Sequence, residues 1–324
     1  MITNNSYLPE GSLINTLENR ELISSLQGLE RAMIYGKILE ATAVLCDESS
    51  KLHVDLFGMR GFIEREECVY RRPNEDIKDI AIITRVGKPV CFKVLRIERD
   101  AIGPYAVLSR REAQKECMQN YLSDLICGDI IPAKVTHIEN FGAFVDIGCG
   151  IPSLLSIDCI SVSRISHPKD RLSVGMQIHT VIKSIDAQNG RIFVSLRELL
   201  GTWEENASSF KSGSTVSGII RSVEKYGIFV ELAPNLAGLA ELRDSTTLSF
   251  ISENIIGRHA AVYIKSIIPE RMKIKLVLID CGDLQKAPPY LKYYIDPSKI
   301  KHIDRWRYSP SVCERIVESI FDTI

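Results

Sequence analysis

The sequence predicts a mainly β protein in which one small all-β barrel or sandwich occurs three times in tandem, joined by short helices. First, ENFGAFVDIG (139–148) has a second version in EKYGIFVELA (224–233). Second, IKSID (182–186) is echoed by IKSII (264–268) at nearly the same offset. Third, a divergent upstream copy, residues 33–112, has short strands and Gly-bearing turns. Internal periodicity of this kind indicates a repeat architecture.

An N-terminal helical segment, residues 1–32, is expected before the first copy. Leu22, Leu26, Leu29 and Met33 recur at spacings of four, three and four residues. This spacing is typical of an amphipathic helix.

The first copy, residues 33–112, contains five strand-like stretches. YGKILEATAVL (35–45) is expected to form the first strand, and KLHVDLFGMRGFI (51–63) the next two. KVLRIERDAIGPYAVLSRRE (93–112) is expected to form a closing hairpin. Short strands separated by glycine-bearing turns favour a small all-β barrel or sandwich.

Two linkers and two further copies follow. REAQKECMQNYLSDLI (111–126) and TWEENASSF (202–210) have the pattern of short linking helices. The predicted boundaries are a helical linker at 113–127, a well-matched barrel at 128–199, a linker at 200–212, a third barrel at 213–282 and a tail at 283–324.

The tail combines basic and aromatic residues and is expected to end in a helix. Residues 286–308 carry six basic residues against two acidic ones, interleaved with tyrosines and a tryptophan. Ser309 and Pro310 form an N-cap and first-turn pair that is typical of a helix start. The apolar stripe of this helix would be Val312, Ile316 and Ile320.

Composition bounds the class of protein. The 324 residues are 45% hydrophobic and 25% charged, as in soluble globular proteins. The formal net charge of −1 lacks the strongly basic balance of many nucleic-acid-binding domains. Any binding of a polyanion must therefore depend on a local face.

The cysteines and the N-terminal stretch predict a cytoplasmic location. Nine cysteines are scattered along the chain without a C-x-x-C pair, as expected in a reducing compartment. The start MITNNSYLPEGS has no basic region followed by an apolar one. No apolar run approaches the ~20 residues that span a bilayer, so no membrane partner is expected.

An aromatic residue stands on the outward face of one strand in the middle copy. Strand side chains alternate between faces with a period of two. The inward row is then Ala143, Val145 and Ile147. The outward row is Gly142, Phe144 and Asp146. The equivalent outward position in the third copy is Phe229, so the outward aromatic recurs.

A second aromatic precedes each glycine and gives the shared pattern F/Y-G-x-F, with Phe141 in the middle copy and Tyr226 in the third. Residues three apart on a regular strand point to opposite faces, so we expect a bulge at the intervening glycine to bring both rings to one face. Two readings stay open. Either the first aromatics cap the bottom of the barrel, or each pair is a stacking platform for the bases of a single strand.

The middle copy resembles a known family at this point. GDIIPAKVTHIENFGAFVDIGCGIPSLLSID, ISHPKDRLSVGMQI and IKSIDAQNGRIFVSLREL together are similar to the RNA-binding domain of the ribosomal protein S1 family. The whole chain resembles the short multi-domain S1 proteins of low-GC Gram-positive, clostridial type. The resemblance implies three tandem five-stranded antiparallel Greek-key OB-fold barrels whose second and third strands present the RNA face.

The resemblance also implies an RNA site in the middle barrel. The family pattern has two aromatics, a histidine on the third strand, an aspartate before the last strand and a basic residue that opens that strand. The matching residues are Phe141, Phe144, Asp186 and Arg191, with Ser156 in place of the histidine. The missing ring predicts a lower affinity than is usual in the family.

The other two copies match the pattern less fully. In the third copy the matches are Tyr226, Phe229 and Lys273, with Glu241 and Ile268 at the histidine and aspartate positions. In the first copy the equivalent residues are Ser50, His53 and Glu64. We therefore expect the first copy to have lost direct RNA binding.

Further RNA contacts are candidates on charge alone. The three lysines in this set are Lys134, Lys183 and Lys265. The tail contributes Arg305, Trp306 and Arg307. Two interpretations of the tail stay equally open: an extension that contacts RNA, or an aromatic segment docked on the third barrel.

The sequence thus predicts a non-catalytic, single-stranded RNA or mRNA binding protein acting in translation at the small ribosomal subunit. The alternative is a protein-interaction scaffold on the ribosome or the RNA-decay machinery. No enzyme, cofactor or metal site is expected, because no nuclease-like acidic cluster is present and His137, His167 and His179 lack metal-ligand spacing.

Overall fold

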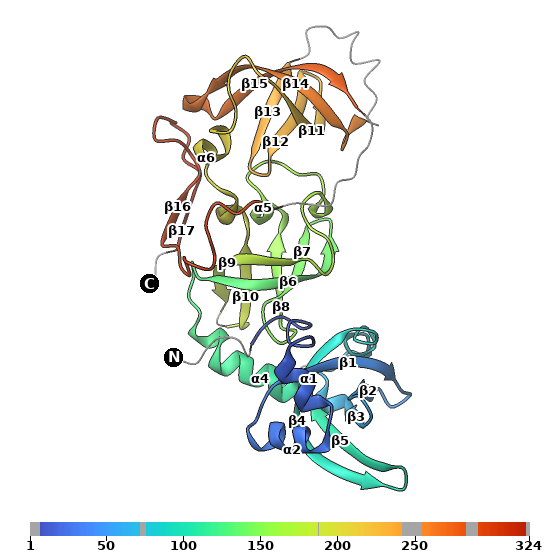
Figure 1. Ribbon diagram of the computed structural model, residues 1–324. Helices are drawn as coiled ribbons and strands as arrows, with labels where there is room; N and C mark the ends of the chain where they lie inside the picture. Colours follow the sequence, from blue (N-terminus) through green and yellow to red (C-terminus); the bar gives the residue numbers. More distant parts are fainter. Residues whose placement is uncertain (1–6, 72–75, 187, 242–254, 283–290, 322–324) are drawn as a thin grey trace. The chain divides into compact units, whose positions relative to one another are not determined.

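Three closed barrels, each of five strands, make up most of the chain (Figure 1). The structure is a computed structural model that describes residues 7–71, 76–186, 188–241, 255–282 and 291–321. Each barrel has the same strand connectivity, in which the third strand lies beside the fifth and the fifth beside the fourth. The predicted fold class of tandem OB-type barrels is therefore confirmed.

The first barrel forms as the sequence predicts. Its strands run in the order β1-β2-β3-β5-β4, with β3 parallel to β5. Their bounds are β1 Leu39–Cys46, β2 Leu52–Asp55, β3 Arg60–Ile63, β4 Pro89–Asp100 and β5 Gly103–Ser109. A short helix, α3 (Asp79–Ile83), lies in the connection between β3 and β4.

The middle and third barrels repeat this order. The middle barrel consists of β6 Ile130–Glu139, β7 Gly142–Asp146, β8 Pro152–Ser156, β9 Gln177–Asp186 and β10 Arg191–Ser195, with α5 Ile157–Ile160 after β8. The third consists of β11 Thr215–Glu224, β12 Gly227–Ala233, β13 Leu236–Glu241, β14 His259–Ile268 and β15 Lys273–Cys281.

The N-terminal segment holds two helices where the sequence predicts one. They are α1 (Leu17–Ile23) and α2 (Leu26–Ile34). Ser25 ends the continuity, because its side chain accepts a hydrogen bond from the Gly28 backbone and caps the second helix. The short linking helices occur as predicted, as α4 (Arg110–Asn120) and α6 (Trp203–Ala207).

The tail does not contain the helix predicted after Ser309. Instead, two short strands pair antiparallel, β16 (Arg305–Arg307) and β17 (Glu318–Ile320). The Ser309 hydroxyl accepts a hydrogen bond from the Val317 backbone at 2.7 Å, so Ser309 closes the intervening loop and caps no helix. The predicted stripe of Val312, Ile316 and Ile320 is exposed, and it therefore has no packing surface to stabilise a helix.

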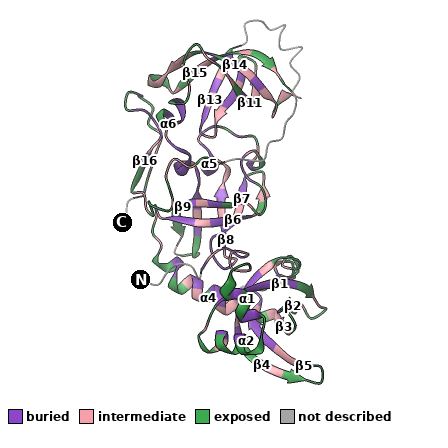
Figure 2. Cartoon of the chain, in the orientation of Figure 1, coloured by how far each residue is buried: buried purple, intermediate pink, exposed green. Residues whose placement is uncertain are grey.

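Side chains on the barrel strands alternate as predicted (Figure 2). Ala143, Val145 and Ile147 are buried, whereas Phe144 between them is half-buried. A side chain at Gly142 would place its Cβ 2.5 Å from the Leu155 carbonyl oxygen. Glycine is therefore required here because β8 passes too close for any other residue.

The described residues form two compact units. One contains the N-terminal segment, the first barrel and residues 132–134 and 146–152. The other contains the remainder of the middle barrel, the third barrel and the tail. Within the described residues, no helix is long and apolar enough to cross a bilayer.

Candidate nucleic-acid interface

An exposed pair of aromatic rings stands on the middle barrel. Phe141 lies in the two-residue turn between β6 and β7 and is 55% exposed, and Phe144 is half-buried on β7. Their ring centroids are 6.2 Å apart and the ring planes are perpendicular at 90°. This is the favourable edge-to-face arrangement, and it leaves the Phe141 ring open to solvent.

The third barrel repeats this geometry. Tyr226 lies in the turn between β11 and β12 and is 59% exposed, and Phe229 is half-buried on β12. The ring centroids are 6.1 Å apart at an interplanar angle of 88°. Exposed first aromatics do not fit the interpretation in which Phe141 and Tyr226 cap the bottom of the barrel.

The predicted bulge at the glycine is wrong in the third barrel. The register is regular from Glu224↔Gly227 to Ser222↔Phe229, and the irregularity lies on β11 at Arg221. The turn itself brings Tyr226 beside Phe229, because a residue in the turn is outside the strand alternation. A Cβ at Gly227 would lie 2.6 Å from the Ala240 carbonyl oxygen, so close strand approach again explains the glycine.

A third ring joins the middle platform, and the sequence interpretation missed it. His137 on β6 has its ring centroid 6.4 Å from that of Phe144, at an interplanar angle of 31°. Its Nε2 lies 2.7 Å from Glu139 Oε1. The signal was available, because counting back from a two-residue hairpin turn places His137 opposite Phe144. This imidazole comes from β6, on the other side of β7 from Ser156, which ends β8.

Asp186 and Arg191 are brought together as paired strand residues. Asp186 accepts hydrogen bonds from the Asn189 backbone at 3.0 Å and from its side chain at 2.8 Å, and these bonds lower the pKa of Asp186. Arg191 is exposed at the start of β10. Ser156 ends β8, and its side-chain hydrogen bond lowers the pKa of Asp158.

Lys183 and Lys265 occupy equivalent β-bulges. Each is the extra residue where the register of the fourth strand steps against the fifth. The Lys183 Nζ is 2.9 Å from Cys159 Sγ and 3.8 Å from Asp158 Oδ2. Lys265 is exposed. Bulges redirect side chains out of the alternation, and the sequence carries little signal for them.

Lys273 opens β15, and it is exposed like Arg191 in the middle barrel. The next outward lysine, Lys275, lies 3.5 Å from Glu241. Glu241 pairs in register with Gly227, directly beside the Tyr226 turn. A carboxylate at this position neutralises part of the cationic face.

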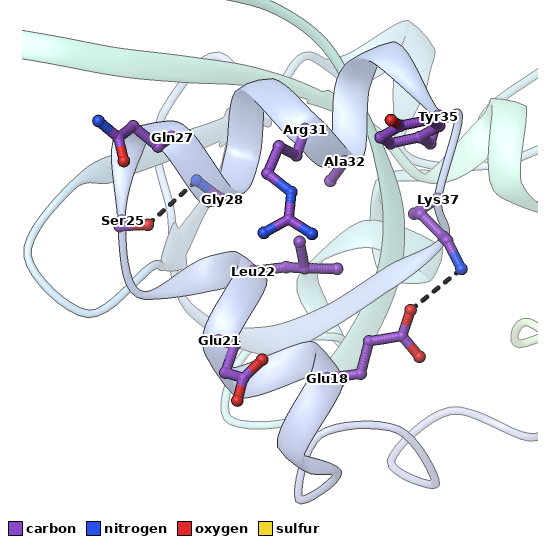
Figure 3. A pocket seen from close by; sticks show the side chains of 10 residues that line it. All are labelled: Glu18, Glu21, Leu22, Ser25, Gln27, Gly28, Arg31, Ala32, Tyr35 and Lys37. Atoms are coloured by element: carbon purple, nitrogen blue, oxygen red, sulfur yellow. Dashed lines mark hydrogen bonds and ion pairs between the residues drawn. The ribbon is translucent and has the colours of Figure 1, made fainter.

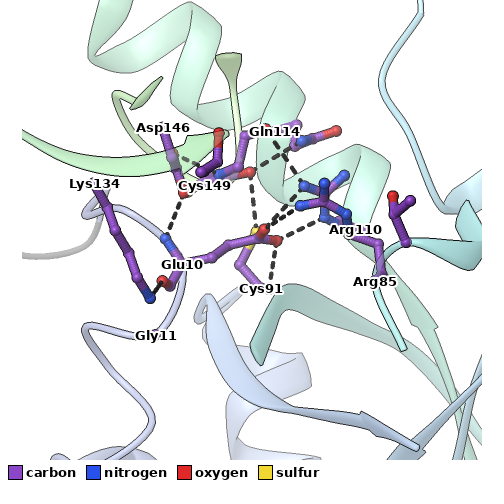
Figure 4. Close-up of polar contacts among 12 residues, drawn as sticks. Glu10, Gly11, Arg85, Cys91, Arg110, Gln114, Lys134, Asp146 and Cys149 are labelled. Carbon is purple, nitrogen blue, oxygen red and sulfur yellow. Dashed lines mark hydrogen bonds and ion pairs between the residues drawn. The ribbon is translucent and has the colours of Figure 1, made fainter. Parts of the chain in front are cut away.

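Lys134 is not a free cation on this face. Its Nζ donates a 2.8 Å hydrogen bond to the Glu10 carbonyl oxygen (Figure 4). The expectation that Lys134 contacts RNA is therefore replaced by a role in holding the N-terminal segment.

The tail residues are divided between packing and surface. Trp306 and Tyr308 are buried in the core of the third barrel, and the Tyr308 hydroxyl donates to the Asn235 carbonyl. Trp306 is therefore no RNA-stacking residue, and the docked interpretation of the tail is the correct one for these aromatics. Arg305 pairs with Glu318 at 2.7 Å, and Arg307 is half-buried. The tail residues Lys286 and Tyr290 lie outside the described residues.

The first barrel has an aromatic cluster that the sequence interpretation did not predict. The Phe62 ring contacts two others: its centroid is 4.9 Å from that of His53 and 5.6 Å from that of Tyr105. Lys51 Nζ lies 5.4 Å and Arg60 Cζ 5.9 Å from the Phe62 centroid. The sequence interpretation missed Phe62 and Tyr105 because neither matches the F/Y-G-x-F pattern.

The cations of this first-barrel cluster are paired with carboxylates. Lys51 Nζ is 2.9 Å from Glu64 Oε1, and Arg60 Nη2 is 2.5 Å from Asp100 Oδ1. His53 Nε2 is 3.0 Å from Asp47 Oδ2. The rings are thus covered by side chains whose charge is already neutralised.

Asp146, predicted to face outward in polar company, is buried. Its Oδ2 accepts a 2.7 Å hydrogen bond from the Glu10 backbone, and its Oδ1 accepts from Gly148 and Gly150 at 2.8 Å and 3.0 Å (Figure 4). The Glu10 carboxylate accepts a 2.6 Å hydrogen bond from Arg110 Nε. The N-terminal segment, 136 residues away in sequence, covers Asp146, which strand alternation alone could not show.

The two carboxyls of this cluster are shifted in opposite directions. Burial raises the pKa of Asp146 to about 7, and the nearby Glu10 charge adds to the effect. Burial also opposes ionisation of Glu10, but the charge and hydrogen bonds of Arg110 outweigh it and lower the pKa of Glu10. Asp146 is therefore a structural residue and no part of an exposed face.

A hollow of about 200 Å³ lies between α1 and α2 (Figure 3). An ion pair between Lys37 and Glu18 at 3.0 Å stands at its edge, and the Arg31 side chain projects into it. The hollow has no aromatic platform comparable with those of the barrels. Across the described ranges, no group of three or more His, Cys, Asp or Glu side chains is arranged to hold a metal ion.

Comparisons with known proteins point to one family. A family model described as the S1 RNA binding domain matches residues 125–197. The small ribosomal subunit protein bS1 homolog of Bacillus subtilis (strain 168) is 30% identical over 237 residues, which cover 72% of this chain and 56% of that protein. The small ribosomal subunit protein bS1 of Leuconostoc lactis is 29% identical over 231 residues, covering 70% and 50%. The chain thus spans about half the length of these relatives.

One solved structure that the chain is similar to is a multidomain protein with nucleic acid binding domains from Streptococcus pneumoniae. It is 14% identical, and the match covers 75% of this chain and 73% of that chain at a TM-score of 0.24. A TM-score of this size supports no functional argument.

Proposed function

Because the chain is a member of the S1 family, we propose that it binds single-stranded RNA on the outward faces of its middle and third barrels. The observation that carries the proposal is the repeated pair of exposed rings, Phe141 with Phe144 and Tyr226 with Phe229. Two copies of one unusual surface feature on two barrels are what a shared ligand would require.

Base stacking supplies the main binding energy in this proposal. Every base has a π-face, so a platform of aromatic rings holds successive bases with little sequence preference, at ~1–3 kcal/mol per base. His137 extends the middle platform by one ring. The expected substrate class is therefore unstructured RNA, including mRNA, without a strict sequence motif.

Phosphate contacts make a smaller contribution. The net charge of −1 leaves few basic groups in excess, and Arg191 and Lys273 are the exposed cations that open the last strands. Each neutralised phosphate of a single strand contributes a slope of about −0.7 to log affinity against log salt. We expect a shallow slope for a short oligonucleotide, corresponding to roughly two to four phosphates.

The cellular role that fits best is in translation, at the small ribosomal subunit and in the cytoplasm. The support comes from the relatives, which carry the name of a small ribosomal subunit protein. The alternative of a protein-interaction scaffold is not favoured, because the matched domain is an RNA-binding one.

The experiment is a fluorescence-anisotropy titration of a pyrimidine-rich oligoribonucleotide with full-length protein. Phe144→Ala removes one ring of the platform, and we expect affinity to weaken by ~1–3 kcal/mol. Thermal stability should change far less than for a fully buried phenylalanine, whose loss costs ~3–5 kcal/mol.

Phe57→Ala is the matched control, because Phe57 is also exposed but lies in a turn of the first barrel. It should leave affinity unchanged. A large drop in melting temperature for Phe144→Ala with unchanged affinity would make Phe144 a core residue and refute the platform.

A further inference from the structure

A loop of the middle barrel lies against the third barrel beside its aromatic pair. The loop runs from Ser161 to Arg171, between α5 and β9 (Figure 1). The loop and the third barrel belong to the same compact unit. The Ser166 hydroxyl donates a 3.2 Å hydrogen bond to the Arg221 carbonyl oxygen. Arg221 directly precedes Ser222, the register partner of Phe229. The loop therefore stands within about one residue rise, ~3.3 Å along the strand, of the platform row.

A buried charge cluster holds this loop in place. Arg171 from the loop and Arg221 from β11 both reach the Glu231 carboxylate, at 2.6 Å and 2.5 Å. Arg221 Nη1 is also 3.2 Å from Asp170 Oδ1. Arg171, Arg221 and Glu231 are all buried. Separating one member from such a cluster would leave an uncompensated buried charge, which disfavours arrangements in which the loop detaches.

Neutral hydrogen bonds around Asn235 reinforce the contact. Asn235 Oδ1 accepts from the Val162 backbone at 3.0 Å, and its Nδ2 donates to the Arg197 carbonyl at 2.9 Å. Arg171 Nη2 donates to the neighbouring Pro234 carbonyl at 3.0 Å. Asn235 is fully buried and satisfied from both sides, which makes the junction rigid.

The loop carries two cations that the cluster does not use. Arg164 and Lys169 are both exposed. Within the described part of the chain, neither side chain has a hydrogen bond or ion-pair partner, in contrast to Arg171. Unpaired cations on a loop that is anchored beside a stacking platform are candidates to contact the phosphates of a strand that the platform binds.

The third barrel needs such help from its neighbour. Glu241 lies beside its platform and pairs with Lys275, so that one of its own cations is neutralised. The aspartate position of the family pattern is occupied by Ile268, which offers no polar contact. A stacking platform alone binds the bases of an RNA strand but makes no contact with its phosphates.

We propose that the third barrel binds RNA through a composite surface, in which Arg164 and Lys169 of the middle barrel contact the phosphates of the strand stacked on Tyr226 and Phe229. This inference rests on the proposed RNA-binding function. It makes the binding surface of the third barrel a joint one of two barrels, and it assigns the Arg171–Glu231–Arg221 cluster the task of positioning the loop.

The test isolates the third barrel within the full-length protein. Phe141→Ala with Phe144→Ala serves as the background, so that stacking depends on Tyr226 and Phe229. Adding Arg164→Ala and Lys169→Ala should weaken binding of an oligouridylate roughly three- to tenfold at low salt. The slope of log affinity against log salt should become shallower by about 0.7 for each lost phosphate contact.

Lys115→Ala in α4 is the matched control, because Lys115 is an exposed cation with only a 3.8 Å ion pair to Glu112. It should change neither affinity nor slope. An unchanged slope for Arg164→Ala with Lys169→Ala, or no binding at all in the background, would overturn the composite surface. Absence of binding by the wild type would instead refute the proposed function itself.

Discussion

The middle and first barrels share one strand order but present opposite outward faces. In the middle barrel the Phe141 ring is uncovered and Phe144 lies edge-on beside it. In the first barrel Lys51 and Arg60 lie over Phe62. The same barrel fold thus presents its aromatic rings either open to solvent or covered by cationic side chains.

This difference teaches what an RNA-stacking face requires. Aromatic content alone does not suffice, because a base needs an unoccupied ring face. In the first barrel the carboxylates of Glu64 and Asp100 pair with the covering cations and would also repel phosphate. We therefore keep the prediction that the first barrel does not bind RNA directly.

A second contrast concerns the acidic residue two positions after each platform aromatic. Asp146 in the middle barrel and Glu231 in the third are both buried by contacts with preceding parts of the chain. The equivalent Asp55 of the first barrel is exposed, and its Oδ1 accepts only from the Phe57 backbone at 3.1 Å among the contacts of the described residues. In the middle and third barrels this position therefore holds another segment of the chain.

The largest expected effect is a loss of stability in the unit that contains the first barrel, without a loss of RNA binding by the middle barrel. Arg110→Ala removes both hydrogen bonds that Arg110 makes to the Glu10 carboxylate, at 2.6 Å and 3.1 Å. The buried carboxylate then keeps only the Cys91 backbone N–H at 3.0 Å and Arg85 at 3.5 Å among its described partners. We expect the free energy of unfolding to fall by about 3–5 kcal/mol in urea titrations, with RNA affinity retained.

Arg111→Ala is the matched control, since this neighbouring arginine pairs with Glu67 at 2.6 Å but is 37% exposed. A pair that is partly open to solvent contributes far less than a buried one, about 1 kcal/mol. Equal stability of the two variants would show that the buried cluster does not anchor the N-terminal segment.

The next effect is a pH dependence specific to the first barrel. Glu40 on β1 accepts hydrogen bonds from the Gly11, Leu13 and Ile14 backbones at 2.9–3.0 Å, yet burial raises its pKa to about 7. The folded protein then binds a proton between about pH 4 and 7 that the unfolded chain releases. The free energy of unfolding should therefore fall as pH rises through this window, by on the order of 1–3 kcal/mol.

Glu40→Gln isolates this contribution, because the variant lacks the titrating group. The difference in unfolding free energy between wild type and variant should change across pH 5 to 7.5 and level off above it. Asp146, whose pKa is also raised to about 7, titrates in both proteins and cancels. A difference that stays constant with pH would show that Glu40 is ionised throughout.

The smallest expected effect tests the covered face directly. Lys51→Ala with Arg60→Ala removes the cations over Phe62. We expect oligoribonucleotide affinity to change by less than about twofold, because these cations are already neutralised by carboxylates. The same titration as for Phe144→Ala measures it. A loss as large as that of Phe144→Ala would place RNA on the first barrel, and a gain would show that its uncovered rings can stack.

Much of the fold and part of the site could be predicted from local pattern. The repeats at 139–148 and 224–233, the inward row of the middle barrel and the short linkers all occur as expected. A two-residue hairpin turn even fixes the neighbours of Phe144, so His137 could have been found. These features depend on residues a few positions apart, where strand period and turn geometry decide the outcome.

The tertiary structure alone decided which outward residues stay on the surface. Lys134 and Asp146 were expected to face solvent, but the N-terminal segment reaches both of them. Trp306 was an equal candidate for RNA contact and for packing, and it is buried in the core of the third barrel. The physical reason is that strand alternation determines the side of the sheet on which a side chain lies. Whether that side meets water depends on segments more than a hundred residues away, through contacts that leave no local pattern.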